Sequence, residues 1–491
     1  MKVSQNEEGN ALKLGELLKK VDIVRAEADM DIEIHGVSYD SRTIRAGELF
    51  VAVKGYIDDG NDFADEAVSR GAVCALSERV PSASIPYVLV EDARRSLAAV
   101  SANWFSNPAE KLAVIGVTGT NGKTTVTSLI KEVLEKCTGE KVGLIGTIKN
   151  MIGGREIAAE RTTPESLEIH GLFSKMVEAG CKYAVMEVSS HALALDRVCG
   201  IEFEVGVFLN LTPDHLDFHE SMEEYARAKA KLFSMCKKGV VNIDDDYAPV
   251  IIGHAKCPVT TFAIRDGDAD LVGKSVKLYP DRVEFCALTI GTLNRVELKI
   301  PGLFSVYNAL SAIAAVMLLG FGSEEISAVL QTCGGVKGRA EAVYSGSGYT
   351  VLIDYAHTPD ALKNIIETIR QCAPRRVITL FGCGGDRDKK KRPVMGGIAA
   401  ALSDRVIVTS DNPRTEEPMA IIEDILSGMA DTKTPVKVIE SRKDAIIYAL
   451  SQLQSGDVLI LAGKGHEEYQ IIGKEKNHFD EREIVAEFFG K

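Results

Sequence analysis

Several features that would place the chain in a specialised class of protein are missing from its sequence. The ten cysteines are scattered and no two form a C-x-x-C pair, which argues against a zinc site and against a disulfide-stabilised fold. The longest apolar stretch, near 309–321, is too short to span a bilayer, so we expect a buried helix there and no membrane insertion. The polar start, MKVSQNEEGN, has no apolar core, so we expect no signal peptide and a cytoplasmic protein with reduced thiols.

Basic charge of the kind that binds nucleic acid is also missing. The net charge is −13, the pI is about 5.4 and no long basic run occurs, so we expect no nucleic-acid partner. The composition is otherwise ordinary for a globular protein, with 45% hydrophobic and 26% charged residues. A chain of 491 residues is too long for one hydrophobic core, and at about 150 residues per domain it predicts roughly three domains.

Apolar runs of strand length alternate with helical patterns along most of the chain. Residues 31–107 predict short strands with intervening helices, as at 49–53 and 87–90, and Asn107-Pro108 indicates a linker. The two longer blocks that follow contain further buried-strand candidates, as at 112–117, 183–188 and 205–209, and predict mostly parallel sheets. We therefore expect an α/β protein with a small α/β N-terminal domain (1–107), a central domain with a P-loop ATPase-like parallel sheet (108–336) and a Rossmann-like, doubly wound C-terminal domain (337–491).

One glycine-rich loop follows a buried-strand candidate and opens a helix, which is the context that a phosphate-binding loop requires. Its glycines let backbone N–H groups approach phosphates, Lys123 would reach the terminal oxygens, and the Thr124 hydroxyl would bind Mg²⁺. The strict G-x-x-x-x-G-K-[ST] pattern fails, because Val117 stands where its first glycine would be. Alone, the loop predicts only a site for a nucleoside triphosphate with Mg²⁺, which motors, switches and ligases share. Its residues are Gly119, Thr120, Asn121, Gly122, Lys123, Thr124 and Thr125.

The string GVTGTNGKTT resembles the Mur ligase and folylpolyglutamate synthetase superfamily, and later motifs occur in the order of that family. These motifs are EVSSHAL (187–193), NLTPDHLDFH (210–219), EEYARAKAKLF (223–233), YNALSAIAA (307–315), GRAE (338–341), DYAHTPDAL (354–362), FGCGGDRDKKKRP (381–393), DNPRTEEP (411–418) and AGKGHEEYQ (463–470). The resemblance covers nearly the whole chain. The DNPR string is similar to the tripeptide-synthetase type of this family.

The resemblance implies a ligase that transfers the γ-phosphoryl group of ATP to a substrate carboxylate, after which an amine attacks the acyl phosphate. It implies that Lys123, Lys229 and His215 are catalytic, and that Lys229 is modified to N6-carboxylysine, a carbamate able to bind Mg²⁺. By resemblance, the metal ligands would be Thr124, Glu187, His215 and the carbamate of Lys229. Further ATP contacts would come from Asn308, Arg339 and Asp354.

The nucleotide-sugar substrate implied by the resemblance is UDP-MurNAc-L-Ala-D-Glu. Tyr39 and Ser41 match uridine contacts, and 56–58 match a nearby contact loop. The contacts to the sugar-peptide portion would come from Thr162, Thr163, Ser189 and Arg197. Some members of the family have Gln two residues before this arginine, whereas here Leu195 cannot donate a hydrogen bond.

In the predicted C-terminal domain (337–491), three loops at strand ends would bring together arginines and acids, which suits a zwitterionic amino acid. The residues concerned are Arg387, Asp411, Asn412, Pro413, Arg414, Gly463 and Glu467. Meso-2,6-diaminopimelate has a second carboxylate that L-lysine lacks, and Arg414 would bind it. A buried arginine left unpaired by lysine would lower its binding strongly.

Other functions remain open on the sequence alone. A lysine-adding tripeptide synthetase is disfavoured by Arg414, and a folylpolyglutamate synthetase by the uridine-type N-terminal block. A non-catalytic nucleotide-gated binding protein would be expected to have lost Glu187, His215 or Lys229, and all three are present. A GTPase switch would be expected to have an N-K-x-D motif that recognises the base, and the sequence has none. We expect a monomer.

Overall fold

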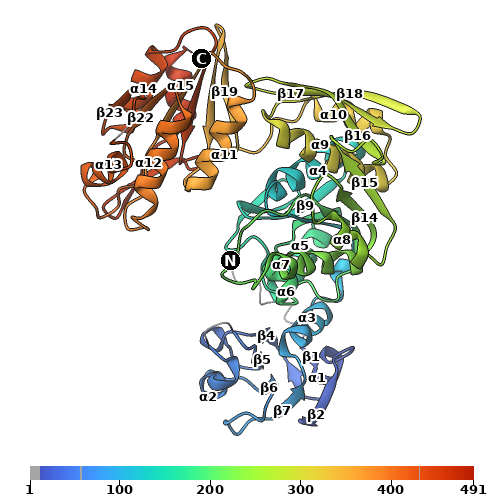
Figure 1. The fold of residues 1–491 in the computed structure, drawn as a ribbon. Helices are drawn as coiled ribbons and strands as arrows, with labels where there is room; N and C mark the ends of the chain where they lie inside the picture. Colours follow the sequence, from blue (N-terminus) through green and yellow to red (C-terminus); the bar gives the residue numbers. More distant parts are fainter. Residues whose placement is uncertain (1–10, 56–57, 431, 491) are drawn as a thin grey trace. The chain divides into compact units, whose positions relative to one another are not determined.

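A computed structural model describes residues 11–55, 58–430 and 432–490, and Figure 1 shows its fold. The expectations for the first ten residues and for Tyr56 and Ile57 lie outside the described residues. The chain forms two compact units, one of Met1–Val272 with Leu310–Ile326, the other of Gly273–Ala309 with Ser327–Lys491. Within the described part, no helix is long and apolar enough to cross a bilayer. The division of the chain at 107 and 336 stays a prediction.

The N-terminal part of the first unit is a five-stranded sheet with helices packed against it. Its strands are ordered β2 (Ile23–Glu27), β7 (Tyr87–Val90), β6 (Cys74–Ser77), β5 (Glu48–Val51) and β4 (Gly36–Ser38). Shorter elements are β1 (Leu12–Lys13), α1 (Leu14–Leu17), β3 (Glu33–Ile34), α2 (Ala64–Ser69) and the 3₁₀ helices η1 (Ser41–Thr43) and η2 (Gly60–Phe63). Helix α3 (Ala93–Trp104) buries Leu97, Val100 and Trp104 in the core of this part.

The rest of the first unit is built on a largely parallel sheet. Its strand order is β11 (Arg155–Ala158), β10 (Lys149–Ile152), β9 (Lys141–Ile145), β12 (Cys181–Glu187), β8 (Ala113–Thr118), β13 (Phe203–Phe208), β14 (Cys236–Asn242) and β15 (Val259–Ala263). The same eleven-stranded sheet continues through β16 (Leu271–Leu278), most of which belongs to the second unit, to β17 (Val283–Thr289) and β18 (Thr292–Leu298). Among the pairs from β11 to β16, β10 pairs antiparallel with β9 and with β11, and the others are parallel. Strands β12, β8 and β13 are neighbours and parallel, so the loops after their carboxyl ends share one edge.

Helices cover this sheet, and several of them begin close to the loops that carry predicted site residues. They are α4 (Lys123–Thr138), α5 (Ser166–Glu178), α6 (Ser190–Ala194), α7 (Met222–Ala230) and α8 (Ala248–His254), with the 3₁₀ helices η3 (Pro108–Lys111) and η4 (Lys231–Ser234). The helix predicted over 223–233 changes to a 3₁₀ helix after Ala230. The apolar stretch near 309–321 falls largely within α9 (Leu303–Leu318), which α10 (Ser323–Leu330) follows.

The second unit contains the β17–β18 hairpin (Val283–Thr289 and Thr292–Leu298) and a six-stranded sheet. The strand order of the sheet is β19 (Glu341–Gly346), β20 (Tyr349–Asp354), β24 (Asp457–Ala462), β21 (Arg376–Phe381), β22 (Arg405–Val408) and β23 (Val436–Val438). All of its pairs are parallel except β19 with β20. A small hairpin, β25 (Tyr469–Ile472) and β26 (Glu475–His478), follows β24.

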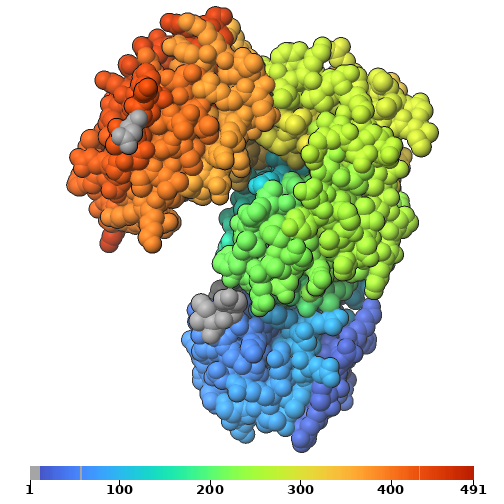
Figure 2. All heavy atoms as spheres, in the orientation of Figure 1, coloured from blue at the N-terminus to red at the C-terminus, as the bar shows by residue number. Residues whose placement is uncertain are grey.

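Alternate residues of this six-stranded sheet face two different layers of helices. Leu352, Val377 and Ile460 pack in one core with α11 (Pro359–Arg370), α12 (Lys391–Leu402) and α13 (Pro418–Ser427). Their sequence neighbours Val351, Ile378 and Leu459 pack in another core with α14 (Arg442–Ser451) and α15 (Glu481–Phe488). Two helical layers on the two faces of a mostly parallel sheet are the doubly wound arrangement expected from the sequence. Figure 2 shows residues 432–490, in orange to red, as part of one closely packed body.

Candidate active site

The glycine-rich loop between β8 and α4 is the central feature of the first unit. Gly122 caps the helix with φ +90°, a conformation that favours glycine. Lys123 folds back over the loop, and its Nζ donates to the carbonyl oxygens of Gly119 and Thr120 at 2.8 and 2.9 Å. The helix thus begins at the loop with its N–H groups directed toward it, as phosphate binding requires.

The loop is held from the side by Asn210 and Thr212, which follow β13, and by Tyr225 of α7, three residues that were not predicted as site residues. Asn210 accepts from the backbone N–H of Thr120 and Asn121, and Thr212 N–H donates to Thr120 Oγ1 at 3.0 Å. Tyr225 OH lies 3.2 Å from Thr120 Oγ1. The signal for Asn210 and Thr212 was their motif, NLT at the end of a strand next to β8, where parallel strand order brings the two loops together.

Lys229 is buried beneath the same loop. Its side chain is 1% exposed, its Nζ donates to Gly119 O at 3.0 Å, and it lies 4.5 Å from the centroid of the Tyr225 ring. Burial, with a smaller effect of Lys123, lowers the pKa of Lys229 well below its usual value. The neutral amine that burial favours is the form that reacts with CO₂ to give a carbamate and a proton, so this site fits the modification implied by the resemblance.

Glu187 ends β12 and is 1% exposed. Its two carboxylate oxygens accept from the backbone N–H and the hydroxyl of Thr147, both at 2.9 Å. Thr147 Oγ1 is in turn 2.9 Å from Thr162 Oγ1, while Thr163 Oγ1 donates to the carbonyl oxygen of Glu187 at 2.8 Å. A predicted metal ligand and two predicted substrate contacts are therefore neighbours.

Arg197 and Ser189 join this group through Thr163. Arg197 Nη1 donates to Thr163 O at 3.1 Å, and Ser189 N–H donates to Thr163 Oγ1 at 3.1 Å. The arginine lies 2.9 Å from Glu165, a buried carboxylate that also contacts Arg94 of α3 at 3.3 Å. Sequence reasoning missed Glu165, although only Pro164 separates it from the threonines in TTPE.

His215 lies in the long loop after β13 with φ +53° and an exposed side chain. Its ring is centred 4.8 Å from that of His191, and its Nε2 is 3.5 Å from Asp214. Within the described ranges, no three His, Cys, Asp or Glu side chains converge as a metal site, but the predicted set holds only two such residues. Carboxylate, hydroxyl and carbamate oxygens are donors that Mg²⁺ prefers. Thr118 Oγ1, buried just before the loop, has no hydrogen-bond partner among the described residues.

The predicted uridine contacts lie beside a cavity in the first unit. Tyr39 OH donates to Glu168 at 2.9 Å, and Ser41 Oγ donates to Glu66 at 2.7 Å. Tyr39 and Glu168 line a cavity of about 340 Å³ together with Ser38, Asp40, Thr43, Asn150, Ile157, Ala158, Glu160, Arg161, Pro164, Glu165, Leu167 and Leu172. Burial raises the pKa of Glu168, one of whose oxygens has no hydrogen-bond partner among the described residues.

The remaining predicted ATP contacts belong to the second unit. Asn308 is buried on α9. Asp354 ends β20, where its carboxylate accepts from the backbone N–H groups of Ala340 and Ala356 at 2.7 and 2.8 Å. Burial raises the pKa of Asp354. The guanidinium of Arg339 lies 5.4 Å from the Tyr355 ring centroid, within cation–π range.

The predicted amino-acid contacts after β22 and β24 meet around a buried lysine that sequence reasoning missed. Lys464 is 0% exposed, and its Nζ lies 3.1 Å from Asn412 Oδ1 and 3.7 Å from both Asp411 and Glu467. Asn412 also donates to Glu467 at 2.9 Å. Gly463 has φ +114°, and a Cβ there would lie 2.7 Å from an Asp411 oxygen. The two acids expected to bind an ammonium group thus already face a cation of the protein.

The arginine of DNPR is held by a glycine pair in the loop after β21. Arg414 follows Pro413, has φ +52°, and donates from Nη1 to Gly385 O at 2.7 Å. A Cβ on Gly384 would lie 2.9 Å from the same guanidinium nitrogen. Arg414 is only partly buried, so leaving it unpaired costs less than the buried arginine expected from the sequence. Arg387 is exposed, and its guanidinium contacts only the carbonyl of Asp386 at 3.4 Å among the hydrogen bonds of the described residues.

Comparison with known proteins gives the same family along the whole chain. Three Mur ligase models match: the Mur ligase family catalytic domain at 33–110, the Mur ligase middle domain at 117–316 and the Mur ligase glutamate ligase domain at 338–465. A protein of Caldanaerobacter subterraneus subsp. tengcongensis named UDP-N-acetylmuramoyl-L-alanyl-D-glutamate–2,6-diaminopimelate ligase is 49% identical over 98% of this chain and 99% of its own length. A Clostridium tetani protein of that name is 45% identical, over 97% and 99% of the two chains.

Solved structures agree with this relationship. A structure of a UDP-N-acetylmuramoyl-L-alanyl-D-glutamate–2,6-diaminopimelate ligase has a TM-score of 0.76 at 30% identity, covering 98% of this chain and 99% of that one. A crystal structure of MurF from Acinetobacter baumannii, at 20% identity and a TM-score of 0.61, shares the fold. With relatives of this identity over nearly its full length, the chain belongs to the Mur ligase family.

Proposed function

We propose that the chain is the ATP-dependent ligase that adds meso-2,6-diaminopimelate to UDP-MurNAc-L-Ala-D-Glu in peptidoglycan precursor synthesis. The relatives that bear this name are 43–49% identical over nearly the full chain. The observation that carries the proposal is the buried Lys229 under the phosphate loop, with its lowered pKa and its contact to Gly119. A P-loop switch or motor has no need of a buried lysine with a lowered pKa at this place.

Phosphoryl transfer is the first step of the proposed reaction. A carboxylate oxygen of the D-Glu residue attacks the γ-phosphorus of ATP, giving an acyl phosphate and ADP. Lys123 and the N–H groups at the start of α4 would hold the phosphates and offset their charge, which supplies most of the catalysis in such transfers. Thr162, Thr163, Ser189 and Arg197 would position the acceptor.

Glu187, His215, Thr124 and the carbamate of Lys229 would hold Mg²⁺. When bound, Mg²⁺ would supply charge neutralisation at the phosphoryl group being transferred. The hydrogen bonds from Thr147 fix the carboxylate of Glu187 in one orientation, which reduces the reorganisation needed when a cation binds. The buried position of Lys229 excludes water from one side of the loop.

The amine of diaminopimelate then attacks the acyl phosphate, an amide bond forms, and inorganic phosphate leaves. Arg414 would bind the distal carboxylate, while Asn412 and Glu467 would contact the ammonium group beside it. Lys464 already lies 3.7 Å from Glu467, so the ammonium group of a bound ligand would share this carboxylate with a lysine of the protein. This would favour a ligand that brings a carboxylate together with its ammonium over L-lysine.

The test is phosphate release from ATP with UDP-MurNAc-L-Ala-D-Glu present, comparing meso-diaminopimelate, L-lysine and no amino acid. Release that requires meso-diaminopimelate supports both the reaction and the specificity. Release that L-lysine supports equally well would overturn the assignment of Arg414. If phosphate is released with neither amino acid, the chain either uses another acceptor or does not catalyse ligation. The monomeric state and the cytoplasmic location remain predictions.

A further inference from the structure

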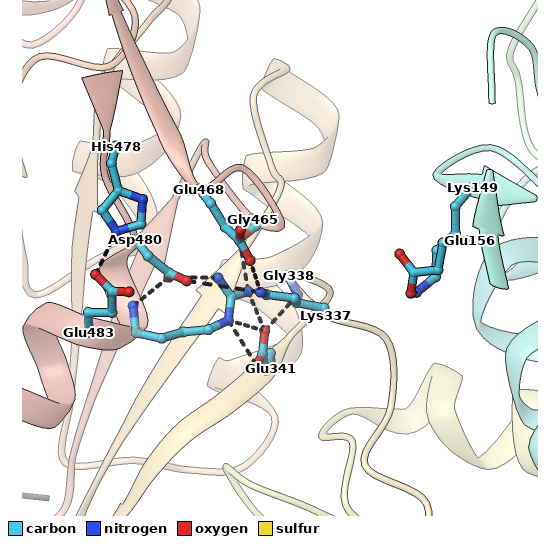
Figure 3. Close-up of polar contacts among 11 residues, drawn as sticks. Lys149, Glu156, Lys337, Gly338, Glu341, Gly465, Glu468, His478, Asp480 and Glu483 are labelled. Carbon is cyan, nitrogen blue, oxygen red and sulfur yellow. Dashed lines mark hydrogen bonds and ion pairs between the residues drawn. The ribbon is translucent and has the colours of Figure 1, made fainter. Parts of the chain in front are cut away.

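Arg482, in the first turn of α15, is the centre of a polar network in the second unit. Its Nε and Nη2 donate to the two oxygens of Glu341 at 3.1 and 2.5 Å, and Nη1 donates to Asp480, the N-cap of the helix, at 3.1 Å. Nη2 also donates to the carbonyl oxygen of Gly465 at 3.0 Å. Figure 3 shows Glu341, Gly465 and Asp480 converging on this guanidinium.

Glu341 connects the network to the turn that carries Arg339. It is the first residue of β19, and its Oε2 accepts from the backbone N–H of Gly338 at 2.7 Å. Arg339 N–H donates to Val336 O at 3.0 Å, and Ala340 N–H donates to Asp354. The carboxylate of Glu341 therefore closes the turn on which one proposed ATP contact lies, close to a second.

Gly465 connects the network to the loop that carries Glu467. A Cβ added to Gly338 would lie 2.2 Å from the backbone of both Gly465 and His466, so the turn and the loop pack backbone against backbone. Lys337 and Glu468 form an ion pair across the same junction. These contacts place the two segments side by side, and the side chain of Arg482 adds hydrogen bonds to both of them.

We propose that Arg482 is a positioning residue that makes the nucleotide-contacting turn and the amino-acid-contacting loop move together, so that binding at either one favours binding at the other. This inference rests on the proposed function. The guanidinium is suited to this role because its planar donors hold Glu341 through two bonds and Gly465 through a third. The side chains of Arg482 and Glu341 are 17% and 23% exposed, so solvent screens their interaction less than that of a surface pair.

The experiment compares Arg482→Gln with Arg482→Lys and with the matched control Glu483→Gln. The control removes the negative charge from the neighbouring His478–Glu483 pair, whose side chains are 66% and 65% exposed and which has no hydrogen bond to either segment among the described residues. For each full-length variant, calorimetry gives the Kd of a non-hydrolysable ATP analogue with and without meso-diaminopimelate, with UDP-MurNAc-L-Ala-D-Glu always present. The ratio of the two Kd values is the coupling factor between the sites.

We expect diaminopimelate to tighten analogue binding about tenfold in the unaltered protein and in Glu483→Gln, and less than about twofold in Arg482→Gln. Arg482→Lys, which keeps the charge but not the two-pronged contact, should give an intermediate factor. A coupling factor that Arg482→Gln leaves unchanged, or a factor near one in the unaltered protein, overturns the proposal. Should Arg482→Gln fail to fold, Arg482→Lys and Glu341→Gln supply the same comparison.

Failure of the proposed function would be recognised separately. If the unaltered protein releases phosphate with a different amino acid, the coupling factor is measured with that amino acid, and the role of Arg482 stands or falls on it. If the unaltered protein binds the analogue but no amino acid changes its Kd, the coupling proposal is wrong whatever the reaction.

Discussion

A lysine buried under a phosphate loop and close to a second lysine cannot easily keep its proton, and this predicts a covalent change at Lys229. Protein incubated with ¹³C-bicarbonate should show a carbamate carbon by NMR. Lys229→Arg should lose that signal, and its activity should be roughly hundredfold lower, because a charge-stabilising group is lost from the site. Lys231→Arg, an exposed lysine two residues on, should keep both. A carbamate signal that survives in Lys229→Arg would assign the modification to another residue.

Arg414 carries the proposed preference for a second carboxylate. Arg414→Ala removes one charge-assisted partner from a partly buried site and should raise the KM for meso-diaminopimelate about tenfold to hundredfold, while the Kd of ATP stays within about twofold. Steady-state kinetics and nucleotide-binding measurements on this variant test the prediction. Arg375→Ala removes an exposed arginine of the same unit that hydrogen-bonds Gln454 and serves as the control. Equal losses for both ligands would show that Arg414 has another role.

At the scale of whole elements, the loop after β21 can hold Arg414 only because two glycines leave room for the DNPR segment. A Cβ on Gly385 would lie 1.9 Å from the Pro413 carbonyl oxygen, so Gly385→Ala must displace one of the two loops. We expect a KM for diaminopimelate raised about tenfold or more with little change in ATP affinity. Gly253→Ala, in helix α8 with nothing within 4 Å of the added carbon, is the matched control. An unchanged KM would mean that Arg414 reaches its ligand from a displaced loop as well.

Helix α5 contains a buried histidine whose protonation should weaken the first unit in acid. His170 is 2% exposed, its Nδ1 has no hydrogen-bond partner within the described residues, and burial lowers its pKa to about 4. The folded protein then binds this proton less readily than the unfolded chain, whose histidine has a pKa near 6.5. The stability associated with neutral His170 is complete above pH ~6.5 and is lost as the pH falls toward ~4.

This loss should amount to about 3 kcal/mol over that pH range, as an upper limit. His170→Leu does not titrate, so its stability should fall less between pH 7 and pH 4 than that of the unaltered protein. Denaturant unfolding followed at several pH values measures the difference. His254→Leu, which replaces an exposed histidine of α8, should behave like the unaltered protein. Parallel pH curves for the unaltered protein and His170→Leu would contradict the buried, neutral histidine.

For the molecule as a whole, the proposed ATP contacts are divided between the two compact units, with 119–125 in the first and Asn308, Arg339 and Asp354 in the second. A ligand that contacts both groups should restrict the units to a narrower range of arrangements. Small-angle scattering should therefore show a smaller radius of gyration with an ATP analogue and both substrates than without ligands. Unchanged dimensions would argue against large-scale closure.

Much of this architecture could be predicted from the sequence because its strands are buried on both faces and appear as continuous apolar runs. The runs at 112–117, 183–188 and 205–209 correspond to β8, β12 and β13, each displaced by no more than two residues. Parallel strand order then predicts that the loops after β8, β12 and β13 share an edge. The family resemblance, and not strand order, implied Thr162, Thr163 and Ser189 as substrate contacts. The boundaries themselves depend on hydrogen bonds at the strand ends that composition does not specify.

What could not be predicted are polar side chains whose burial depends on distant neighbours. Lys464 stands between two glycines and looks like a loop residue, yet it is enclosed by Asn412 and Tyr469. Glu165 appears to be a surface acid until Arg94, some seventy residues earlier in the chain, contacts it. Local pattern carries no information about such contacts, which arise only when separate segments pack together.

The backbone contact between Gly338 and the Gly465–His466 peptide also constrains protein engineering. In a chimaera that takes its amino-acid-recognition loops from one parent and its nucleotide-binding segments from another, a crossover between residues 341 and 463 would join surfaces that evolved separately. Because backbone contacts backbone at this point, a mismatch could not be relieved by changing a side chain. Recombination of specificity among such ligases should therefore place its junction before Lys337, so that both surfaces descend from one parent.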